Sequence, residues 1–168
     1  GFCLFNNVAV ATETALQSKD VSRVAILDFD VHHCNGTVDI FKDRDEVLVC
    51  SRFQENFYPH RYLDFSTGHT INTPLAVATT GSQFRHRIEQ DWVPAIQSHK
   101  PDFIFISAGF DAHRDDPLGQ LSLLEEDYAW VTRLIIDLAN DLSGGKLVST
   151  LEGGYDLTAL ANCVETHV

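Results

Sequence analysis

The chain has 168 residues, of which 44% are hydrophobic, so it is long enough to form one globular core. Its formal net charge of −12 disfavours a direct nucleic-acid binder, because that class of protein usually carries a basic face. No apolar run reaches membrane-spanning length, no signal peptide is visible, and the four cysteines show no paired spacing, which predicts a cytoplasmic protein with reduced thiols and no membrane partner.

The first part of the chain begins with a helical pattern, predicted at 7–19. Two short runs that are apolar on both faces follow at 24–29 and 46–51, and this pattern is typical of buried strands. The next segment, 54–80, lacks clean periodicity. We therefore predict that it is a long functional loop.

In the second part of the chain, helical patterns and apolar strand-like runs alternate in the same way. The remaining predicted elements are a helix at 83–99, a strand at 102–109, a helix at 123–142, a strand at 146–154 and a helix from Leu157 onward. Pro94 is expected to kink or break the first of these helices. Strands that alternate with helices predict an α/β fold with a parallel sheet flanked by helices.

Acidic and histidine residues follow the predicted strands. The first strand ends in Asp28, Asp30 and His32, which are alternate residues and so share one face. The third strand leads into "SAGFDAHRDDPLG", and the fourth leads into "LEGGYDL". Because ligands in open α/β sheets lie beyond the carboxyl ends of the strands, these segments are expected to converge on one site.

Buried carboxylates are costly unless another group compensates their charge, and a divalent metal would do so. Two carboxylates and one imidazole suit zinc and leave a fourth position open for water. Tyr155, on a glycine-rich loop, could donate a hydrogen bond to a developing oxyanion. Each motif alone has a plainer interpretation: a D-x-H run is common by chance, Asp116-Pro117 is typical of a turn, and "GGY" is typical of a flexible turn. Only their combination is specific.

The motifs "GFCLFNN", "DFDVHHCNGT", "SAGFDAHRDDPLGQL" and "LEGGYDL" occur in the order seen in the histone deacetylase family of the arginase/deacetylase superfamily. The sequence resembles the bacterial class II-like members and the acetylpolyamine amidohydrolases over essentially the whole chain. The resemblance implies a zinc-dependent amidohydrolase with an arginase/deacetylase-like fold. Its substrates would be an acetylated lysine peptide or an acetylpolyamine.

Residue by residue, the resemblance implies three zinc ligands, Asp30, His32 and Asp116. Tyr155 matches the tyrosine that polarises the substrate carbonyl, and Asp28 matches a carboxylate that orients a catalytic histidine. These assignments are carried over from the family and do not follow from spacing.

The resemblance also implies a structural site for K⁺ or Na⁺ and a narrow channel for the acyl-lysine stem. The cation site would be formed by the hydroxyl of Ser51, by Asp28 and by backbone carbonyls of Asp30 and His32. The residues expected along the channel are Phe2, Tyr58, Gly153 and Gly154.

The sequence departs from the family pattern in two places. Cys34 stands where the family usually has glycine after the histidine pair. The family's catalytic histidine pair lies upstream of the "GFC" motif, and no residue precedes Gly1 here. His33 would point away from His32 on a strand, so it is not expected to substitute.

The chain contains no methionine and opens directly on "GFCLFNN", which suggests one partial catalytic domain spanning 1–168 and truncated at both ends. We expect such a chain to be weak or inactive by itself, and to self-associate through apolar surface that a longer domain would bury. Two alternatives stay open: a non-catalytic remnant that binds a metal or a partner, and an arginase-like ureohydrolase. The ureohydrolase needs a D-x-H-x-D run, and Cys34 replaces the second aspartate of that run.

Overall fold

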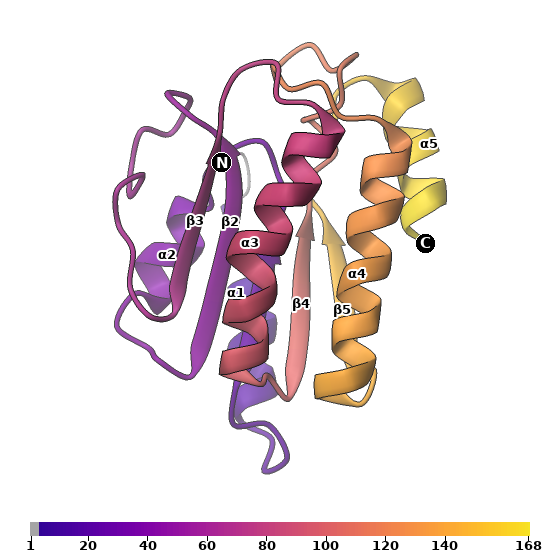
Figure 1. Cartoon of the computed structure of the whole chain (residues 1–168). Coiled ribbons are helices and arrows are strands. Elements are labelled where there is room, and N and C mark those ends of the chain that lie inside the picture. Colours follow the sequence, from indigo (N-terminus) through magenta and orange to yellow (C-terminus); the bar gives the residue numbers. More distant parts are fainter. Residues whose placement is uncertain (1–3) are drawn as a thin grey trace.

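A computed structural model describes residues 4–168 as a five-stranded sheet with helices on both faces (Figure 1). All strand pairings are parallel, and the strand order is β3-β2-β1-β4-β5. The elements are α1 (Asn7–Leu16), β1 (Val24–Asp28), α2 (Asn35–Phe41), β2 (Val47–Gln54), β3 (Thr70–Leu75), α3 (Gly81–His99), β4 (Phe103–Ala108), α4 (Glu125–Ser143), β5 (Leu147–Leu151) and α5 (Leu157–His167). The predicted parallel α/β architecture is confirmed.

The central strands are buried on both faces, and their side chains alternate between two apolar cores. On β1, Ala25 and Leu27 pack into the core beneath α3 and α4, whereas Val24 and Ile26 pack into the core beneath α1 and α2. Figure 1 shows α3 and α4 together in front of the sheet. The continuous apolar run of β1 therefore has a direct physical reason, because neither of its faces meets water.

The order of the strands reverses next to β1. The chain runs from β1 to β2 and β3 on one side, and β4 then pairs with the opposite edge of β1, with Asp28 beside Ser107. In open α/β sheets, ligands bind where the strand order reverses, beyond the carboxyl ends of the strands. The segments that follow β1 and β4 therefore flank the favoured position for a site.

Three local features differ from the sequence-based expectations. The expected loop 54–80 contains the edge strand β3, which pairs with β2 from Val49↔Thr70 to Gln54↔Leu75. The short helix α2 was not predicted. Helix α3 continues through Pro94, so the expected break is not found. Trp92 and Ile96 are both buried on either side of this proline, and their packing compensates for the hydrogen bond that proline cannot donate.

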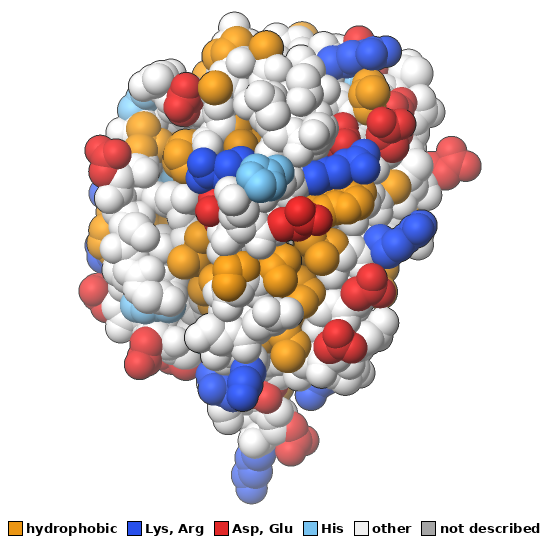
Figure 2. Space-filling view, in the orientation of Figure 1, with side chains coloured by type: hydrophobic (Ala, Val, Ile, Leu, Met, Phe, Trp, Pro, Cys, Tyr) orange, Lys and Arg blue, Asp and Glu red, His pale blue; other side chains and the backbone are white. Residues whose placement is uncertain are grey.

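The surface retains apolar groups. On the edge strand β5, Val148 is 49% exposed and Leu151 is 57% exposed. Figure 2 shows apolar side chains between charged ones over α3 and along its border with α4. Within the described residues, no helix is both long and apolar enough to cross a membrane. Self-association through these surfaces stays a prediction.

Candidate metal centre

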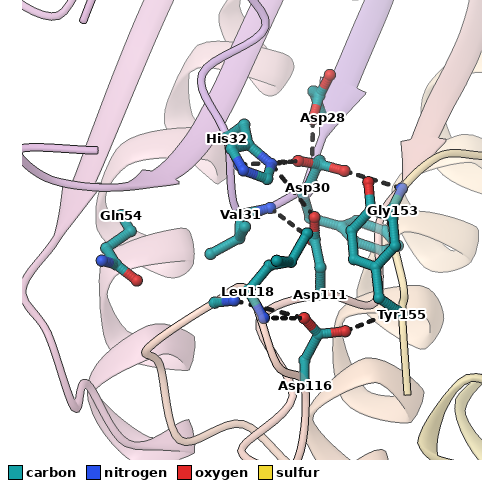
Figure 3. Close-up of polar contacts among 12 residues, drawn as sticks. Asp28, Asp30, Val31, His32, Gln54, Asp111, Asp116, Leu118, Gly153 and Tyr155 are labelled. Carbon is teal, nitrogen blue, oxygen red and sulfur yellow. Dashed lines mark hydrogen bonds and ion pairs between the residues drawn. The ribbon is translucent and has the colours of Figure 1, made fainter. Parts of the chain in front are cut away.

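Three side chains meet at the reversal of strand order: Asp30, His32 and Asp111. Asp30 and His32 follow β1, and Asp111 follows β4. The Nδ1 atom of His32 lies 2.8 Å from Asp30 Oδ1 and 3.3 Å from Asp111 Oδ2. One ligand-type atom from each residue lies within 4.8 Å of the others, and this is the only such group of three among residues 4–168. The cluster could therefore hold one metal ion (Figure 3).

Backbone amides hold the two carboxylates in place. Asp30 Oδ2 accepts from Gly153 N at 2.9 Å, and Asp111 Oδ1 accepts from Val31 N at 2.8 Å. Asp30 Oδ1 also accepts from the backbone N–H of His32 at 2.8 Å. The segments that follow β1, β4 and β5 thus fix one another through the cluster, as Figure 3 shows.

The shifted pKa values in the cluster arise because Asp30 and Asp111 share one partner, the His32 imidazole. Burial tends to lower the pKa of His32, but hydrogen bonds to Asp111 and Asp30 outweigh burial and raise it to about 9. Burial and the nearby charge of Asp30 raise the pKa of Asp111 to about 6. For Asp30, burial acts in the opposite direction, but its hydrogen bonds to His32 leave the pKa lowered.

The donor set fits a zinc ion. Two carboxylates and one imidazole face a common point, and zinc favours such oxygen and nitrogen ligands. Asp111 is fully buried, and its Oδ2 lies 3.3 Å from His32 Nδ1, the same atom that contacts Asp30 Oδ1. Two carboxylates that share a single imidazole are incompletely compensated, and a bound cation would supply the missing positive charge.

Asp116 lies outside this cluster, in contrast to the sequence-based expectation. Its Oδ1 accepts from Leu118 N at 2.9 Å, and its Oδ2 accepts from Tyr155 N at 2.7 Å. Both oxygens therefore bind backbone amides and join the loop after β4 to the loop after β5 (Figure 3). The second acidic member of the cluster is Asp111, which follows β4 closely, as Asp30 follows β1. Proximity to the strand end was the sequence signal that could have identified it.

Asp28 and Ser51 lie beside each other at the site. They are register partners on β1 and β2 and both are buried. Asp28 Oδ1 accepts from Asp30 N at 3.0 Å, while Ser51 Oγ accepts from Cys34 N at 3.3 Å. Burial, followed by the charge of Asp30, raises the pKa of Asp28 well above its usual value.

Aromatic rings cover His32. The Phe57 ring is stacked on the imidazole with a centroid distance of 5.0 Å, and the Tyr58 ring meets it edge-on at 6.1 Å. Tyr58 was expected at the site, whereas Phe57 was missed because the segment that carries it has no regular periodicity. Phe2, the other expected aromatic residue, lies outside the described residues.

The loop after β5 approaches the cluster through glycine. A Cβ atom on Gly153 would lie 2.1 Å from Asp111 Oδ2 and 2.6 Å from Asp30 Oδ2, so a side chain there would displace the carboxylates. Gly154 has a φ of 139°, a conformation that favours glycine. Tyr155 follows directly and is 38% exposed.

His33 is turned away from the cluster. Its Nε2 lies 3.0 Å from Asn72 Oδ1, and its ring meets Phe53 edge-on at 4.8 Å. Although His33 is the neighbour of His32, the two imidazoles contact different residues. His33 is therefore not placed to exchange protons at the cluster.

Comparison with known proteins gives a consistent result. A sequence model of the histone deacetylase domain matches residues 1–168. The chain is 39% identical to histone deacetylase 14, chloroplastic, of Arabidopsis thaliana, over 98% of this chain and 40% of that protein. It is 36% identical to the histone deacetylase-like amidohydrolase of Pseudomonas aeruginosa, over 97% of this chain and 45% of that protein.

A solved structure shares the fold. The crystal structure of the HDA15 HD domain matches with a TM-score of 0.89 and 35% sequence identity, over 99% of this chain and 49% of that chain. The chain thus spans less than half the length of the two curated relatives above and about half of this structure.

Proposed function

The chain belongs to the histone deacetylase family, and we propose that its protein hydrolyses an N-acyl amide, removing an acetyl or other acyl group from a lysine side chain or a polyamine nitrogen with zinc as cofactor. The products would be a carboxylate and a free amine. The observation that carries this proposal is the cluster of Asp30, His32 and Asp111, in which two carboxylates share one imidazole.

In this proposal Asp30, His32 and Asp111 hold the zinc ion, with Asp111 in place of Asp116. An ion bound there would supply Lewis-acid catalysis and lower the pKa of water toward about 7. The contribution of the protein is to hold two carboxylates and one imidazole in a fixed arrangement. The amides of Gly153 and Val31 support that role.

The groups that would meet the substrate come from two loops. Tyr155 would donate a hydrogen bond to the carbonyl oxygen as negative charge develops on it. Phe57 and Tyr58, whose rings lie against His32, would form one wall of an apolar channel for the stem of the acyl-lysine. Gly153 and Gly154, which have no side chains, would leave room in the channel for the acyl-lysine stem.

Asp28 has two proposed roles, orienting a catalytic histidine and contributing, with Ser51 and the carbonyls of Asp30 and His32, to a K⁺ or Na⁺ site. The register of Asp28 beside Ser51 supports the second role. Since His33 faces Asn72, we expect the general acid and base to come from outside the described residues. The 168 residues alone should then be weak or inactive.

The ureohydrolase alternative is less well supported. That chemistry needs two metal ions, whereas residues 4–168 contain a single group of three clustered ligands. Cys34 also stands where the second aspartate of the required run would be. A non-catalytic remnant remains the alternative that the following experiment separates.

The test measures zinc content and hydrolysis together. We expect the intact protein to bind one zinc ion per chain and to release acetate from an acetyl-lysine peptide or an acetylpolyamine. A chelator should abolish hydrolysis, and added zinc should restore it. The 168-residue chain assayed alongside should bind zinc yet turn over at least ~10²-fold more slowly, because we expect the general acid and base to lie outside the described residues. Zinc binding by the intact protein without turnover would favour the remnant, and urea release from a guanidino substrate would favour the ureohydrolase.

Replacing Gly153 with alanine should disrupt the proposed zinc site. The new Cβ would overlap Asp111 Oδ2 and Asp30 Oδ2, and metal-ligand distances tolerate shifts of only about 0.2 Å. We expect zinc affinity to fall ~10–100-fold, as it does when groups that support metal ligands are lost. Competition with a chromogenic chelator measures this change.

Gly68→Ala is the matched control, because no atom lies within 4 Å of its added Cβ. It should leave zinc affinity unchanged. Equal affinities for Gly153→Ala and the unsubstituted protein would argue against zinc binding at this cluster.

A further inference from the structure

Arg52, on β2, carries a guanidinium group in an unusual position. Its side chain is fully buried, and its Cζ lies 5.3 Å from the centre of the Phe84 ring on α3. Its Nη2 donates a hydrogen bond to the backbone carbonyl of Phe29, whereas its Nε and Nη1 make no hydrogen bond to a described residue. A buried cation with so few partners is costly, so the bond to Phe29 is the interaction that calls for explanation.

The Phe29 carbonyl belongs to the peptide group that leads into Asp30. The other side of this peptide group, the N–H of Asp30, donates to Asp28 Oδ1 at 3.0 Å. Both polar atoms of the peptide are therefore held by side chains, one from β1 and one from β2. Strand β1 ends at Asp28, so this peptide group lies beyond the regular hydrogen bonds of the sheet. The bond from Arg52 therefore fixes a part of the backbone that strand pairing does not hold.

The orientation of this peptide determines where the Asp30 side chain begins. A rotation would move the Asp30 carboxylate away from His32 Nδ1, which lies 2.8 Å from it, and away from Gly153 N. Arg52 is fully buried and its guanidinium lies over the Phe84 ring, so the guanidinium has little freedom to move.

We propose that Arg52 is a positioning residue for the metal ligands, which fixes Asp30 by holding the Phe29 carbonyl; this inference rests on the zinc site proposed above. Its positive charge taken alone would have the opposite effect, because it repels a metal cation. If the main effect of Arg52 is to position Asp30, removal of the side chain weakens zinc binding. If the main effect is the repulsion between its charge and the metal, removal strengthens zinc binding. The sign of the change distinguishes the two.

The test measures the zinc affinity of the intact protein carrying Arg52→Met, which removes the charge and the donors but keeps a long side chain. We expect affinity to fall ~10–100-fold, the range seen for groups that orient metal ligands. Arg52→Lys keeps the charge but not the planar fork of donors, so its affinity should also fall, by a smaller factor. The absorption spectrum of bound Co²⁺ should change in both variants, because the arrangement of the ligands changes.

Ser143→Ala is the matched control, because it removes a buried side-chain bond to a backbone carbonyl, that of Pro101, at the C-terminal end of α4. It should lower the melting temperature without changing zinc affinity or the Co²⁺ spectrum. If Arg52→Met does not fold, the zinc affinity and Co²⁺ spectrum of Arg52→Lys alone test the inference.

The inference is overturned if the unsubstituted protein binds zinc and the Arg52 variant binds it equally well or more tightly. A different failure, in which the unsubstituted protein binds no zinc, would refute the proposed function itself. Loss of zinc affinity in Ser143→Ala equal to that of the Arg52 variant would also overturn the inference, because general destabilisation would then explain both.

Discussion

Asp111→Ala should lower zinc affinity by more than about 100-fold. Asp111 is fully buried and its Oδ2 lies 3.3 Å from His32 Nδ1, within the cluster of potential ligand atoms, which is the arrangement expected of a direct ligand. Loss of a direct ligand should exceed the roughly 10–100-fold cost of losing a group that only orients a ligand. Titration against a competing chelator measures the affinity, and circular dichroism checks that the variant is folded.

Asp116→Ala is the informative comparison, because the resemblance to the family implied Asp116 as a zinc ligand. Its carboxylate accepts from Tyr155 N and Leu118 N, so its removal should loosen the loop of Tyr155 while leaving Asp30, His32 and Asp111 together. We expect zinc affinity to fall less than about 10-fold and hydrolysis to fall more steeply. A loss of zinc affinity equal to that of Asp111→Ala would restore Asp116 as the ligand.

The sheet was predictable because its central strands carry a strong local signal. The apolar run of β1 is buried on both faces, and its alternation with helices indicated parallel pairing. Strand β3 was missed because it is an edge strand with a polar sequence, TINTPL, that includes Pro74. Its backbone conformation depends on pairing with β2, which no local pattern encodes.

The site was predictable in part for a similar reason. The spacing of Asp30 and His32 indicated a shared face, and the structure brings these two together. The choice between Asp111 and Asp116 depends instead on how the loop after β4 turns. That turn is stabilised by contacts with Val31 and Tyr155, which lie far away in the sequence, so spacing within the loop does not determine it.

Arg52 illustrates the same limit at one position. It directly follows the strand predicted at 46–51, whereas β2 continues to Gln54 in the structure, so the sequence indicated neither its burial nor the direction of its guanidinium. Only the pairing of β1 with β2 brings that side chain to the Phe29 carbonyl. Residues that position a metal ligand without contacting the metal can thus be identified only from the paired strands and not from the sequence.

Tyr155→Phe should reduce kcat by ~10²–10³-fold, the usual cost of removing one donor to a developing oxyanion. The loop places this tyrosine next to the proposed metal site: Gly153 N binds Asp30, and Tyr155 N binds Asp116. Phenylalanine keeps the ring and both backbone contacts, so the substitution removes only the hydroxyl group. Zinc affinity should be unchanged, because Tyr155 is not among the three clustered ligands. Steady-state hydrolysis of an acetyl-lysine peptide by the zinc-loaded intact protein gives kcat and KM.

Tyr62→Phe provides the control for loss of a tyrosine hydroxyl. That hydroxyl donates to Asp39, a residue on α2 and outside the metal cluster, so kcat should be unaffected. A change in KM alone for Tyr155→Phe would mean that the hydroxyl binds the ground state and the transition state equally. A fall in kcat of less than about threefold would remove Tyr155 from the mechanism, and another donor would then have to face the carbonyl oxygen. Because the hydroxyl would act on charge that develops only during reaction, the proposal requires the loss to appear in kcat.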